Sequence, residues 1–494
     1  MANWTSFGDR MLNFHRSMLK SWCNCSGLKS FQYSSTRRGG GLLLGGGCLK
    51  KAAHFSPMGR RHCSSSPTPP PVSTPSPLLF VPPGVSVVDQ KNSDEYSDKD
   101  YFHFFSLSEQ SQFRVPKSLR IPWQRDLLTP DAAPCVGSSH GWLAFNHPRN
   151  CHPYLYNPLM DTPDFPYVPL PSVETLPSVA AVRLLKSDHL SPSPPLIKQF
   201  LIFLHDNERN VSTEDISHFY VRRLVMSSPP SLPCYSSSPC GNDCTIMAIH
   251  SASEDIAFCK PGDHSWTTLD TSVGPYIDII YFSKDQRFYA MRSYLSIEAW
   301  DLTDPSCPKK HVFDNPLFCP GKFEEGKIAE SYNCDETDYL VESSGDLLLV
   351  SRFIAVSVTE NGIPHPRRLE KKIENNNGER ENCFLHDDDA YWTLGFDVHR
   401  FDFDHNKWEP VECLGDRALF VGSNNSFSLS TLNHPELMGN SIYFTDDYFD
   451  GFNKIYRGHD NGVFHLEDHC IKPSYPRRLK IIDPHPVWIA PSTM

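Results

Sequence analysis

Residues 398–412 read VHRFDFDHNKWEPVE, and in this stretch an apolar strand leads through a polar turn into a second strand. The same arrangement recurs as PYLYNPLMDTPDFPYVPL (153–170), DIAFCKPGDHSWTTL (255–269), IEAWDLTDPSCPKKHVF (297–313) and GVFHLEDHCIKP (462–473). In two copies a tryptophan, Trp266 or Trp408, follows the turn, where an aromatic ring can pack between adjacent sheets. Units that recur at about 40 residues, or at a multiple of that interval, are typical of four-stranded propeller blades.

The rest of the chain is consistent with an all-β class. Convincing long amphipathic helices are missing, and 43 prolines against 27 glycines indicate short elements joined by rigid turns. Further runs of strand length lie at 142–145, 200–204, 245–249, 276–282, 347–350 and 353–358. Because a closed ring of sheets buries both faces and leaves no long edge, we predict a single β-propeller of about six or seven four-stranded blades over residues 85–494. A β-sandwich array is the structural alternative.

The first 66 residues differ in charge from the rest of the chain. They hold ten basic residues against one acid, Asp9, whereas the remainder holds 36 basic and 57 acidic residues, a net charge of −21. A basic, Ser-rich, acid-poor N-terminus is typical of an organellar transit peptide. Its apolar stretch at 42–44 is far shorter than a secretory signal requires, and no apolar run in the sequence is long enough for a membrane span.

The expected transit peptide, residues 1–63, ends in RRHCSSS at 60–66. This pattern resembles a mitochondrial processing site, so we predict cleavage between Cys63 and Ser64. The alternatives are a disordered basic tail and a chloroplast or dual address. Residues 64–84 read SSSPTPPPVSTPSPLLFVPPG, which predicts an extended Pro/Ser-rich linker.

The cysteines indicate that the protein works in a reducing compartment, and their spacing does not indicate a metal site. Twelve of the 16 cysteines lie beyond the predicted cleavage site, at irregular spacings in a chain too large to need disulfides. Cys234, Cys240 and Cys244 form a cluster, but it lacks a C-x-x-C pair and lies in a Ser/Pro-rich stretch. We therefore expect no cofactor and no metal.

Several longer motifs resemble one plant family. They are GSSHGWLAF (137–145), YNPLMD (156–161), IAFCKPGDHSW (256–266), YLVESSGDLLLVSR (339–352), FDFDHNKWEPVECLGDRALFVG (401–422), NSIYFTDD (440–447) and DNGVFHLED (460–468). Together they resemble the plant KIB-type β-propeller family, catalogued as domain of unknown function 295, over about residues 100–490. Many members carry an N-terminal F-box and look like substrate adapters of ubiquitin ligases. This chain has a presequence and a proline linker there instead, so it is similar to the organellar branch that lacks the F-box.

The sequence gives little support for a catalytic residue. GSSHG at 137–141 matches the nucleophile elbow that would make Ser139 catalytic, but a strand and then a proline turn follow it where a helix is required. The acidic clusters at 386–389, 402–406 and 446–450 lack a metal-binding motif. The family resemblance implies that their acids are ordinary turn residues of blades. Trp300-Asp301 is interpreted as a blade-packing pair, and single histidines such as His250 and His399 as strand or loop residues. A catalytic pair of carboxylates from distant strands remains an alternative, because sequence spacing does not show which acids meet in the fold.

These observations favour a non-catalytic protein-interaction scaffold in the mitochondrion. The alternatives are a carboxylate-using hydrolase in the propeller channel and a residual ubiquitin-ligase substrate adapter. The residues beyond position 66 carry a net charge of −21, and this negative charge opposes nucleic-acid binding and favours a basic protein partner. We expect a monomer without a membrane span, and the sequence does not identify the partner.

Overall fold

The computed structural model of the chain describes residues in the part from 76 to 490. The predicted transit peptide, with Cys63 and Ser64, lies outside the described residues. The described ranges are 76–81, 101–116, 135–147, 151–160, 167–186, 196–204, 207–213, 216–217, 220–230, 244–251, 253–269, 275–292, 295–314, 316–318, 334–358, 390–448, 458–473, 482 and 485–490. None of the helices in these ranges has the length and hydropathy needed to cross a membrane.

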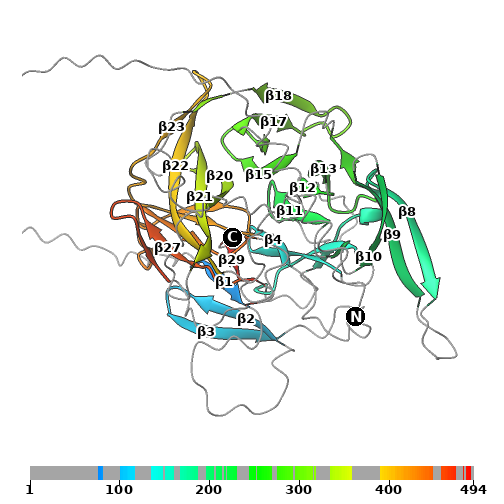
Figure 1. Cartoon of the computed structure of the whole chain (residues 1–494), viewed down its shortest axis with the longest axis horizontal. Helices are drawn as coiled ribbons and strands as arrows, with labels where there is room; N and C mark the ends of the chain where they lie inside the picture. The colour runs from blue at the N-terminus through cyan, green and yellow to red at the C-terminus, as the bar shows by residue number, and fades with distance from the viewer. Residues whose placement is uncertain are drawn as a thin grey trace, which may run out of the picture. The chain divides into compact units, whose positions relative to one another are not determined.

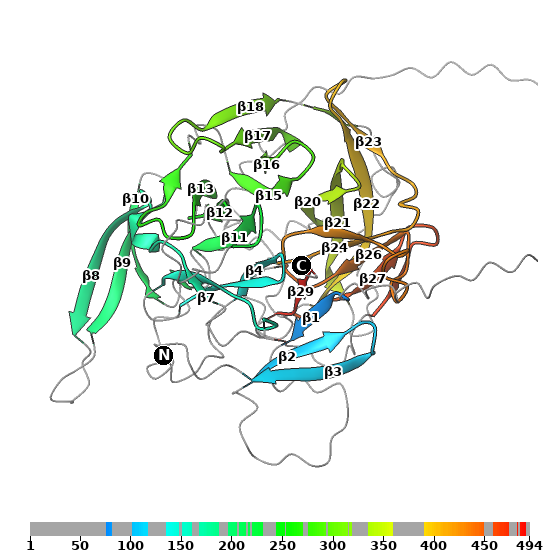
Figure 2. The ribbon, with the colours of Figure 1, turned by 180° about the vertical axis from the view of Figure 1, so that it is seen from behind.

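The described elements are strands β1 to β29 and one short 3-10 helix, η4 (Val173–Thr175). The strands form seven sheets, six of which stand around a common centre (Figures 1 and 2). Contacts between the inner strands of neighbouring sheets run from β29 to β4, β11, β15, β20 and on to β24 and β25. The six sheets are therefore the blades of one β-propeller, which confirms the predicted fold class.

Blades 1 to 3 are each four-stranded. Blade 1 has the order β29-β1-β2-β3, from β1 (Leu78–Val81), β2 (Tyr101–Ser106), β3 (Ser111–Pro116) and β29 (Val487–Ile489). Blade 2 comprises β4 (Cys135–Ser139), β5 (Trp142–Asn146), β6 (Pro153–Tyr156) and β7 (Tyr167–Pro169). Blade 3 comprises β11 (Val221–Met226), β12 (Ile246–His250), β13 (Asp255–Cys259) and β14 (Thr267–Thr268).

Blade 4 has four strands, and blades 5 and 6 have five. Blade 4 comprises β15 (Tyr276–Phe282), β16 (Arg287–Arg292), β17 (Ile297–Asp301) and β18 (Lys309–Phe313). Blade 5 has the order β19-β23-β22-β21-β20, from β19 (Leu317–Phe318), β20 (Cys334–Ser343), β21 (Asp346–Val358), β22 (Ala390–Asp402) and β23 (Lys407–Pro410). Blade 6 has the order β25-β24-β26-β27-β28, from β24 (Arg417–Val421), β25 (Phe427–Ser430), β26 (Ser441–Phe444), β27 (Gly462–His465) and β28 (Cys470–Lys472).

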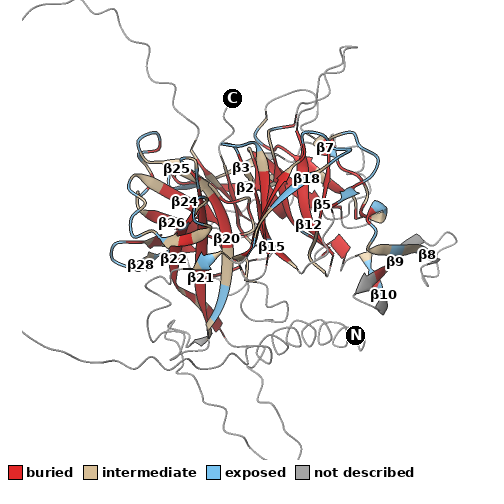
Figure 3. Cartoon of the chain, turned by 90° about the horizontal axis from the view of Figure 1, so that it is seen from above, coloured by how far each residue is buried: buried red, intermediate tan, exposed pale blue. Residues whose placement is uncertain are grey.

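The seventh sheet is an insertion between blades 2 and 3. It has three antiparallel strands, β8 (Val179–Lys186), β9 (Leu196–Leu204) and β10 (Asn207–Ser212), and it stands outside the ring (Figures 1 and 3). Among the described side chains of this sheet, those of Phe200, Ile202 and Val211 are buried, and the others are half-buried or exposed. The side sheet is therefore an addition to the ring and not a seventh blade.

Hydrophobic clusters lie between neighbouring blades. One joins blades 3 and 4 through residues such as Phe258 and Trp300, and another joins blades 4 and 5 through residues such as Phe282 and Trp408. Further clusters join blades 5 and 6, blades 6 and 1, and blades 1 and 2. Because each sheet buries both faces against its neighbours, the stability of any blade depends on the two beside it.

All five strand-turn-strand units predicted from the sequence are outer hairpins of blades. They correspond to β6–β7, β13–β14, β17–β18, the end of β22 with β23, and β27–β28. Trp408 lies between blades 4 and 5, as predicted. Trp266 is buried, and its indole Nε1 donates to the carbonyl oxygen of Pro171 beyond blade 2 at 2.8 Å, so it also packs between blades.

The predicted linker boundary at residue 84 is wrong, because β1 (Leu78–Val81) lies inside the predicted linker. This strand pairs antiparallel with β2 on one side and with β29 on the other. Prolines on both sides made LLFV resemble part of a linker, although four consecutive apolar residues suit a buried strand. Its partner β29 lies at the far end of the chain, so no local pattern indicates the pairing.

Candidate functional site

The centre of the ring contains two buried arginines, one on β21 and one on β11. The side chain of Arg352 is fully buried, and that of Arg223 is 10% exposed. Because burying an unpaired charge is very unfavourable, each guanidinium needs carboxylates or carbonyl oxygens around it. Both residues have them, and these partners come from different blades.

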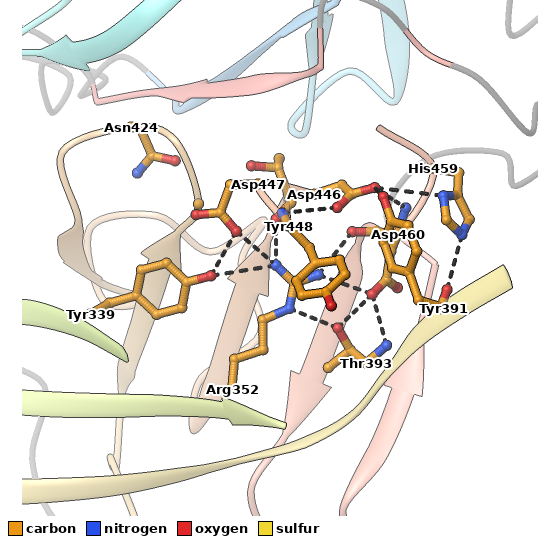
Figure 4. Close-up of polar contacts among 12 residues, drawn as sticks. Tyr339, Arg352, Tyr391, Thr393, Asn424, Asp446, Asp447, Tyr448, His459 and Asp460 are labelled. Atoms are coloured by element: carbon orange, nitrogen blue, oxygen red, sulfur yellow. Dashed lines mark hydrogen bonds and ion pairs between the residues drawn. The ribbon is translucent and has the colours of Figure 1, made fainter. Parts of the chain in front are cut away.

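Arg352 is surrounded by acceptors from blades 5 and 6 (Figure 4). Its Nη1 donates to Asp447 Oδ1 at 3.0 Å and its Nη2 to Asp460 Oδ2 at 2.9 Å. Its Nε donates to Thr393 Oγ1 at 2.8 Å, and Nη1 also donates to the carbonyl oxygen of Thr445 at 2.9 Å. Burial acts to lower the pKa of Arg352, but the neighbouring Tyr339, Asp460 and Asp447 outweigh it and raise the pKa above its usual value. The guanidinium is therefore a permanent positive charge.

The carboxylates around Arg352 are themselves hydrogen-bonded. Asp460 Oδ2 accepts from the backbone N–H and the hydroxyl of Thr393, both at 2.7 Å. Asp447 Oδ1 accepts from the hydroxyl of Tyr339 at 2.8 Å. Asp446 Oδ2 accepts from the hydroxyl of Tyr391 at 2.8 Å and from the backbone N–H of Asp460 at 3.2 Å.

Asp446 also lies beside a histidine at the far side of this network (Figure 4). His459 Nδ1 is 3.5 Å from Asp446 Oδ2, and its Nε2 is 3.0 Å from the carbonyl oxygen of Tyr391. Burial raises the pKa of Asp446, while His459 and Arg352 act in the opposite direction. The prediction that Asp446 and Asp447 are ordinary turn residues is wrong: they follow β26 where blade 6 meets the long strands of blade 5, and there they bind across the interface.

The second arginine links four blades. Arg223 Nε on β11 is 2.8 Å from Asp278 Oδ1 on β15, and Arg223 Nη1 donates to the carbonyl oxygen of Gly422 at 2.9 Å. Asp278 Oδ2 accepts from the backbone N–H of Leu340 on β20 at 2.8 Å. Blades 3, 4, 5 and 6 thus meet at one ion pair. Burial raises the pKa of Asp278, and Arg223 acts to lower it.

The segment at 422–426, between β24 and β25, extends this connection to the remaining blades. The backbone N–H of Asn425 donates to the carbonyl oxygen of Ser138 in blade 2 at 3.0 Å. The hydroxyl of Ser138 in turn donates to the carbonyl oxygen of Trp488 in blade 1. The segment 422–426 and the two arginine networks form what we call the central polar network. It contacts blades 2 to 6 directly, and Ser138 links it to blade 1.

Gly422 shows how closely this segment is packed. It has a φ of 140°, and a Cβ there would lie 2.1 Å from Thr445 Oγ1. Real Cβ atoms do not approach another heavy atom so closely, so any other residue here would force the Thr445 side chain or the backbone to shift.

The candidate nucleophile Ser139 is placed as the strand-like sequence after it predicts. It ends β4, and His140 (φ 51°) with Gly141 (φ 80°) turns the chain directly into β5. Ser139 is buried, and its Oγ accepts from Asn425 Nδ2 at 3.5 Å. The strand–turn–helix geometry of a nucleophile elbow is therefore replaced by a hairpin.

The 402–406 cluster is a turn, as the sequence comparison indicates. Asp402 Oδ1 accepts from the backbone N–H groups of Asp404 and His405 at 3.0 and 3.2 Å. The 386–389 cluster, Cys234 and Cys240 lie outside the described residues, whereas Cys244 is buried and its thiol donates to the carbonyl oxygen of Ser228 at 3.0 Å. Across the described ranges, no group of three or more His, Cys, Asp or Glu side chains is arranged to hold a metal ion.

Trp300, His250 and His399 are also placed as the sequence interpretation predicts. Trp300 belongs to the cluster between blades 3 and 4, and Asp301 Oδ1 caps the following turn by accepting from the N–H of Thr303 at 3.1 Å. His250 ends β12 and His399 lies within β22, both buried.

The central polar network suits a structural role better than an acid–base role. Each of its carboxylates has at least one oxygen that accepts from an arginine, a tyrosine or a backbone N–H group. Sequence reasoning missed both arginines. One signal was available: Arg352 stands in the apolar run LLLVSRFIAV, where an isolated charge requires a buried partner.

Comparison with known proteins gives a family match and distant relatives. The KIB1-4 β-propeller family matches residues 104–465. The Arabidopsis thaliana F-box protein SKIP23 is 24% identical over 384 residues, which cover 75% of this chain and 79% of that protein. An Arabidopsis F-box/kelch-repeat protein is 22% identical over 57% of this chain and 69% of its own length. Another Arabidopsis F-box protein is 27% identical, and the match spans 39% of this chain and about half, 47%, of that relative.

Proposed function

Because the chain belongs to the KIB1-4 β-propeller family, we propose that it is a non-catalytic protein-interaction scaffold that acts in the mitochondrion. Relatives named as F-box proteins support a protein-binding role for the propeller in general terms. The mitochondrial address rests on the ten basic residues and single acid of the first 66 residues.

The observation that carries the proposal is that the carboxylates of the central polar network accept hydrogen bonds from arginines, tyrosines and backbone N–H groups. In many propellers the centre of the ring hosts a ligand or a catalytic pair, but here Arg223 and Arg352 already hold the carboxylates of Asp278, Asp447 and Asp460. These contacts join blades to one another, so they favour a rigid ring over a reactive centre. A rigid ring with loops at its rims is suited to presenting a binding surface.

Charge favours a basic protein as the partner. Beyond residue 66 the chain holds 57 acidic and 36 basic residues, so long-range attraction speeds encounters with a positive surface. Such an association weakens as salt rises, because charges are screened over about 10 Å at about 0.1 M ionic strength.

Proximity labelling with the full chain in intact plant cells tests this proposal. We expect labelled proteins to be mitochondrial and enriched in basic surfaces. The matched control is a chain in which the six arginines of the first 66 residues are replaced by glutamine, which should stay in the cytosol because the membrane potential acts on positive charge. Equal import of both chains would contradict the assigned address.

A ubiquitin-ligase substrate adapter is the second candidate, and the names of the relatives favour it. It predicts that the adaptor subunit of such a ligase co-purifies with the full chain from the cytosol. Recovery of that subunit, together with cytosolic labelling, would replace the mitochondrial scaffold by the adapter.

A further inference from the structure

Blade 6 contains a loop of ten residues, 431–440, which connects β25 to β26 and which we call the blade 6 loop. Both of its ends are held by the chain just before β24. The backbone N–H of Thr431 donates to the carbonyl oxygen of Asp416 at 2.9 Å, and the backbone N–H of Leu414 donates to Asn440 Oδ1 at 2.8 Å. A loop of this length whose ends lie close together is an Ω-loop, a form that frequently carries function.

Hydrogen bonds and buried side chains fix the backbone of the blade 6 loop. The backbone N–H of His434 donates to the carbonyl oxygen of Ser430 at 3.1 Å, and that of Leu437 donates to the carbonyl oxygen of His434 at 3.0 Å. The backbone N–H of Met438 donates to the hydroxyl of Tyr443 at 2.9 Å. The side chains of His434 and Leu437 are buried. Because the loop is held in one conformation, it loses little conformational entropy when a partner binds to it.

Two large apolar side chains of the blade 6 loop are exposed to solvent. Leu432 is 83% exposed and Met438 is 38% exposed. Among the described residues, five large hydrophobic side chains are exposed, and these two share one loop. A single exposed apolar residue needs no explanation, but two in a loop with a fixed backbone indicate a surface that a partner covers.

Negative charge accompanies these apolar side chains. Glu436 belongs to the loop, while Glu412 and Asp416 belong to the chain that holds its ends. The loop and the six residues before β24 contain these three acids and no lysine or arginine, and Arg417 is the first basic residue that follows. Three carboxylates against one guanidinium leave this surface negative, so it attracts a positively charged partner and disfavours an acidic one.

We propose that the blade 6 loop is the docking site for a basic segment of a partner protein that also presents apolar side chains. This inference rests on the proposed function, and it names the surface by which the scaffold holds its basic partner. Leu432 and Met438 pack against the apolar side chains of that segment, and this burial supplies most of the affinity. The carboxylates of Glu412, Asp416 and Glu436 face its lysines and arginines, which speeds the encounter and fixes the orientation.

Binding of three synthetic peptides to the purified full chain tests the docking site. The probe is a fluorescent amphipathic peptide of lysine and leucine. One control peptide carries glutamate in place of lysine, and the other carries serine in place of leucine. We expect only the probe to bind at about 0.1 M salt, because it alone combines positive charge with apolar side chains. Fluorescence anisotropy measures the three affinities.

One matched pair of variants separates the loop from exposed leucines in general. Leu432→Ser should weaken binding of the probe by at least about tenfold, because the probe then loses its main apolar contact. Leu317→Ser is the control, since Leu317 is also exposed, at 67%, but lies on β19 in blade 5, and this variant should bind as the parent protein does. Thermal unfolding of both variants confirms that they are folded.

Two native cysteines show where the probe binds. Cys413 lies in the chain that holds the loop, whereas Cys307 lies in the turn between β17 and β18 of blade 4, and both are exposed. The probe should slow the reaction of Cys413 with a maleimide and leave that of Cys307 unchanged, as measured by mass spectrometry.

The possible results separate this inference from the proposed function. Probe binding that is insensitive to Leu432→Ser and leaves Cys413 reactive overturns the docking site but keeps a basic partner. Failure of the probe to bind at all contradicts both. Self-association of the parent protein that is lost in Leu432→Ser, measured by sedimentation, assigns the loop to a second copy of the chain and also overturns the proposal. The experiment uses purified protein, so a wrong mitochondrial address leaves its result unchanged.

Discussion

Blade 5 and blade 1 occupy the same ring but are held in different ways. Blade 5 is built from long strands of one stretch of chain, with β21 and β22 at 13 residues each, and the Arg352 contacts tie it to blade 6. Blade 1 combines a strand of four residues and a strand of three residues from opposite ends of the chain, and apolar side chains hold them. The difference indicates that polar side-chain contacts hold blades 5 and 6 together, whereas blade 1 depends on the burial of short apolar strands.

Removal of β1 should give the largest effect. A chain that begins at residue 85 lacks three buried apolar side chains and the half-buried Leu78. Each buried side chain contributes about 1.5–3 kcal/mol, and their sum is comparable to the whole stability of a typical domain. We expect this chain to lose its cooperative thermal transition, whereas chains that begin at residue 64 or 74 should unfold alike. Calorimetry on the three chains makes the comparison, and a normal transition for the shortest would show that β1 is dispensable.

Loss of the buried Arg352 side chain should give the second largest effect. Arg352→Ala leaves Asp447 and Asp460 without their cation, and breaking a buried pair in this way lowers the free energy of unfolding by about 3–5 kcal/mol. Arg352→Lys should not restore stability, because an ammonium cannot reach the same set of acceptors. The control is Arg400→Ala, which removes an exposed ion pair with Glu409 and should change stability by less than about 1 kcal/mol. Urea unfolding measures all three, and similar losses for Arg352→Ala and Arg400→Ala would refute the special role of the network.

A smaller effect should follow from adding one methyl group at the centre. Gly422→Ala places a Cβ 2.1 Å from Thr445 Oγ1, and overpacking of this kind lowers stability by about 1–3 kcal/mol. Gly262→Ala is the matched control, because Gly262 also has a positive φ, 94°, but no atom lies within 4 Å of the added Cβ. The difference between the two variants in denaturant unfolding isolates the clash from the backbone strain. Equal losses of stability in the two variants would mean that the segment 422–426 shifts to accommodate the added methyl group at no extra cost.

The pH dependence of the network should be the smallest effect, and its sign is fixed. Burial raises the pKa of Asp446, so the folded protein binds this proton more tightly than the unfolded chain. The contribution of Asp446 to stability is therefore present below its ordinary pKa and is lost as pH rises through the raised value. Asp446→Asn lacks this loss, so its free energy of unfolding should rise relative to the parent protein as pH increases from about 4.

Asp402→Asn provides the opposite case. Hydrogen bonds from His405 lower the pKa of Asp402, so the stabilisation due to this carboxylate is present above its ordinary pKa and is lost as pH falls. The free energy of unfolding of Asp402→Asn should therefore decrease relative to that of the parent protein as pH rises. Unfolding curves at several pH values test both signs, and the same trend in the two variants would contradict the assignment.

What the sequence by itself determined is local: the β class and the outer hairpins. In residues 398–412 the strand, the Asp402 turn and Trp408 all lie within a few positions of one another, so their pattern survives in the sequence. The tertiary structure alone decided how the ring is closed and what lies at its centre. Leu79 pairs with Trp488, and Arg352 binds Asp460, which is 108 positions away. The first pair joins opposite ends of the chain within one sheet, and the second joins two blades whose sheets pack face to face, so neither composition nor periodicity indicates these partners.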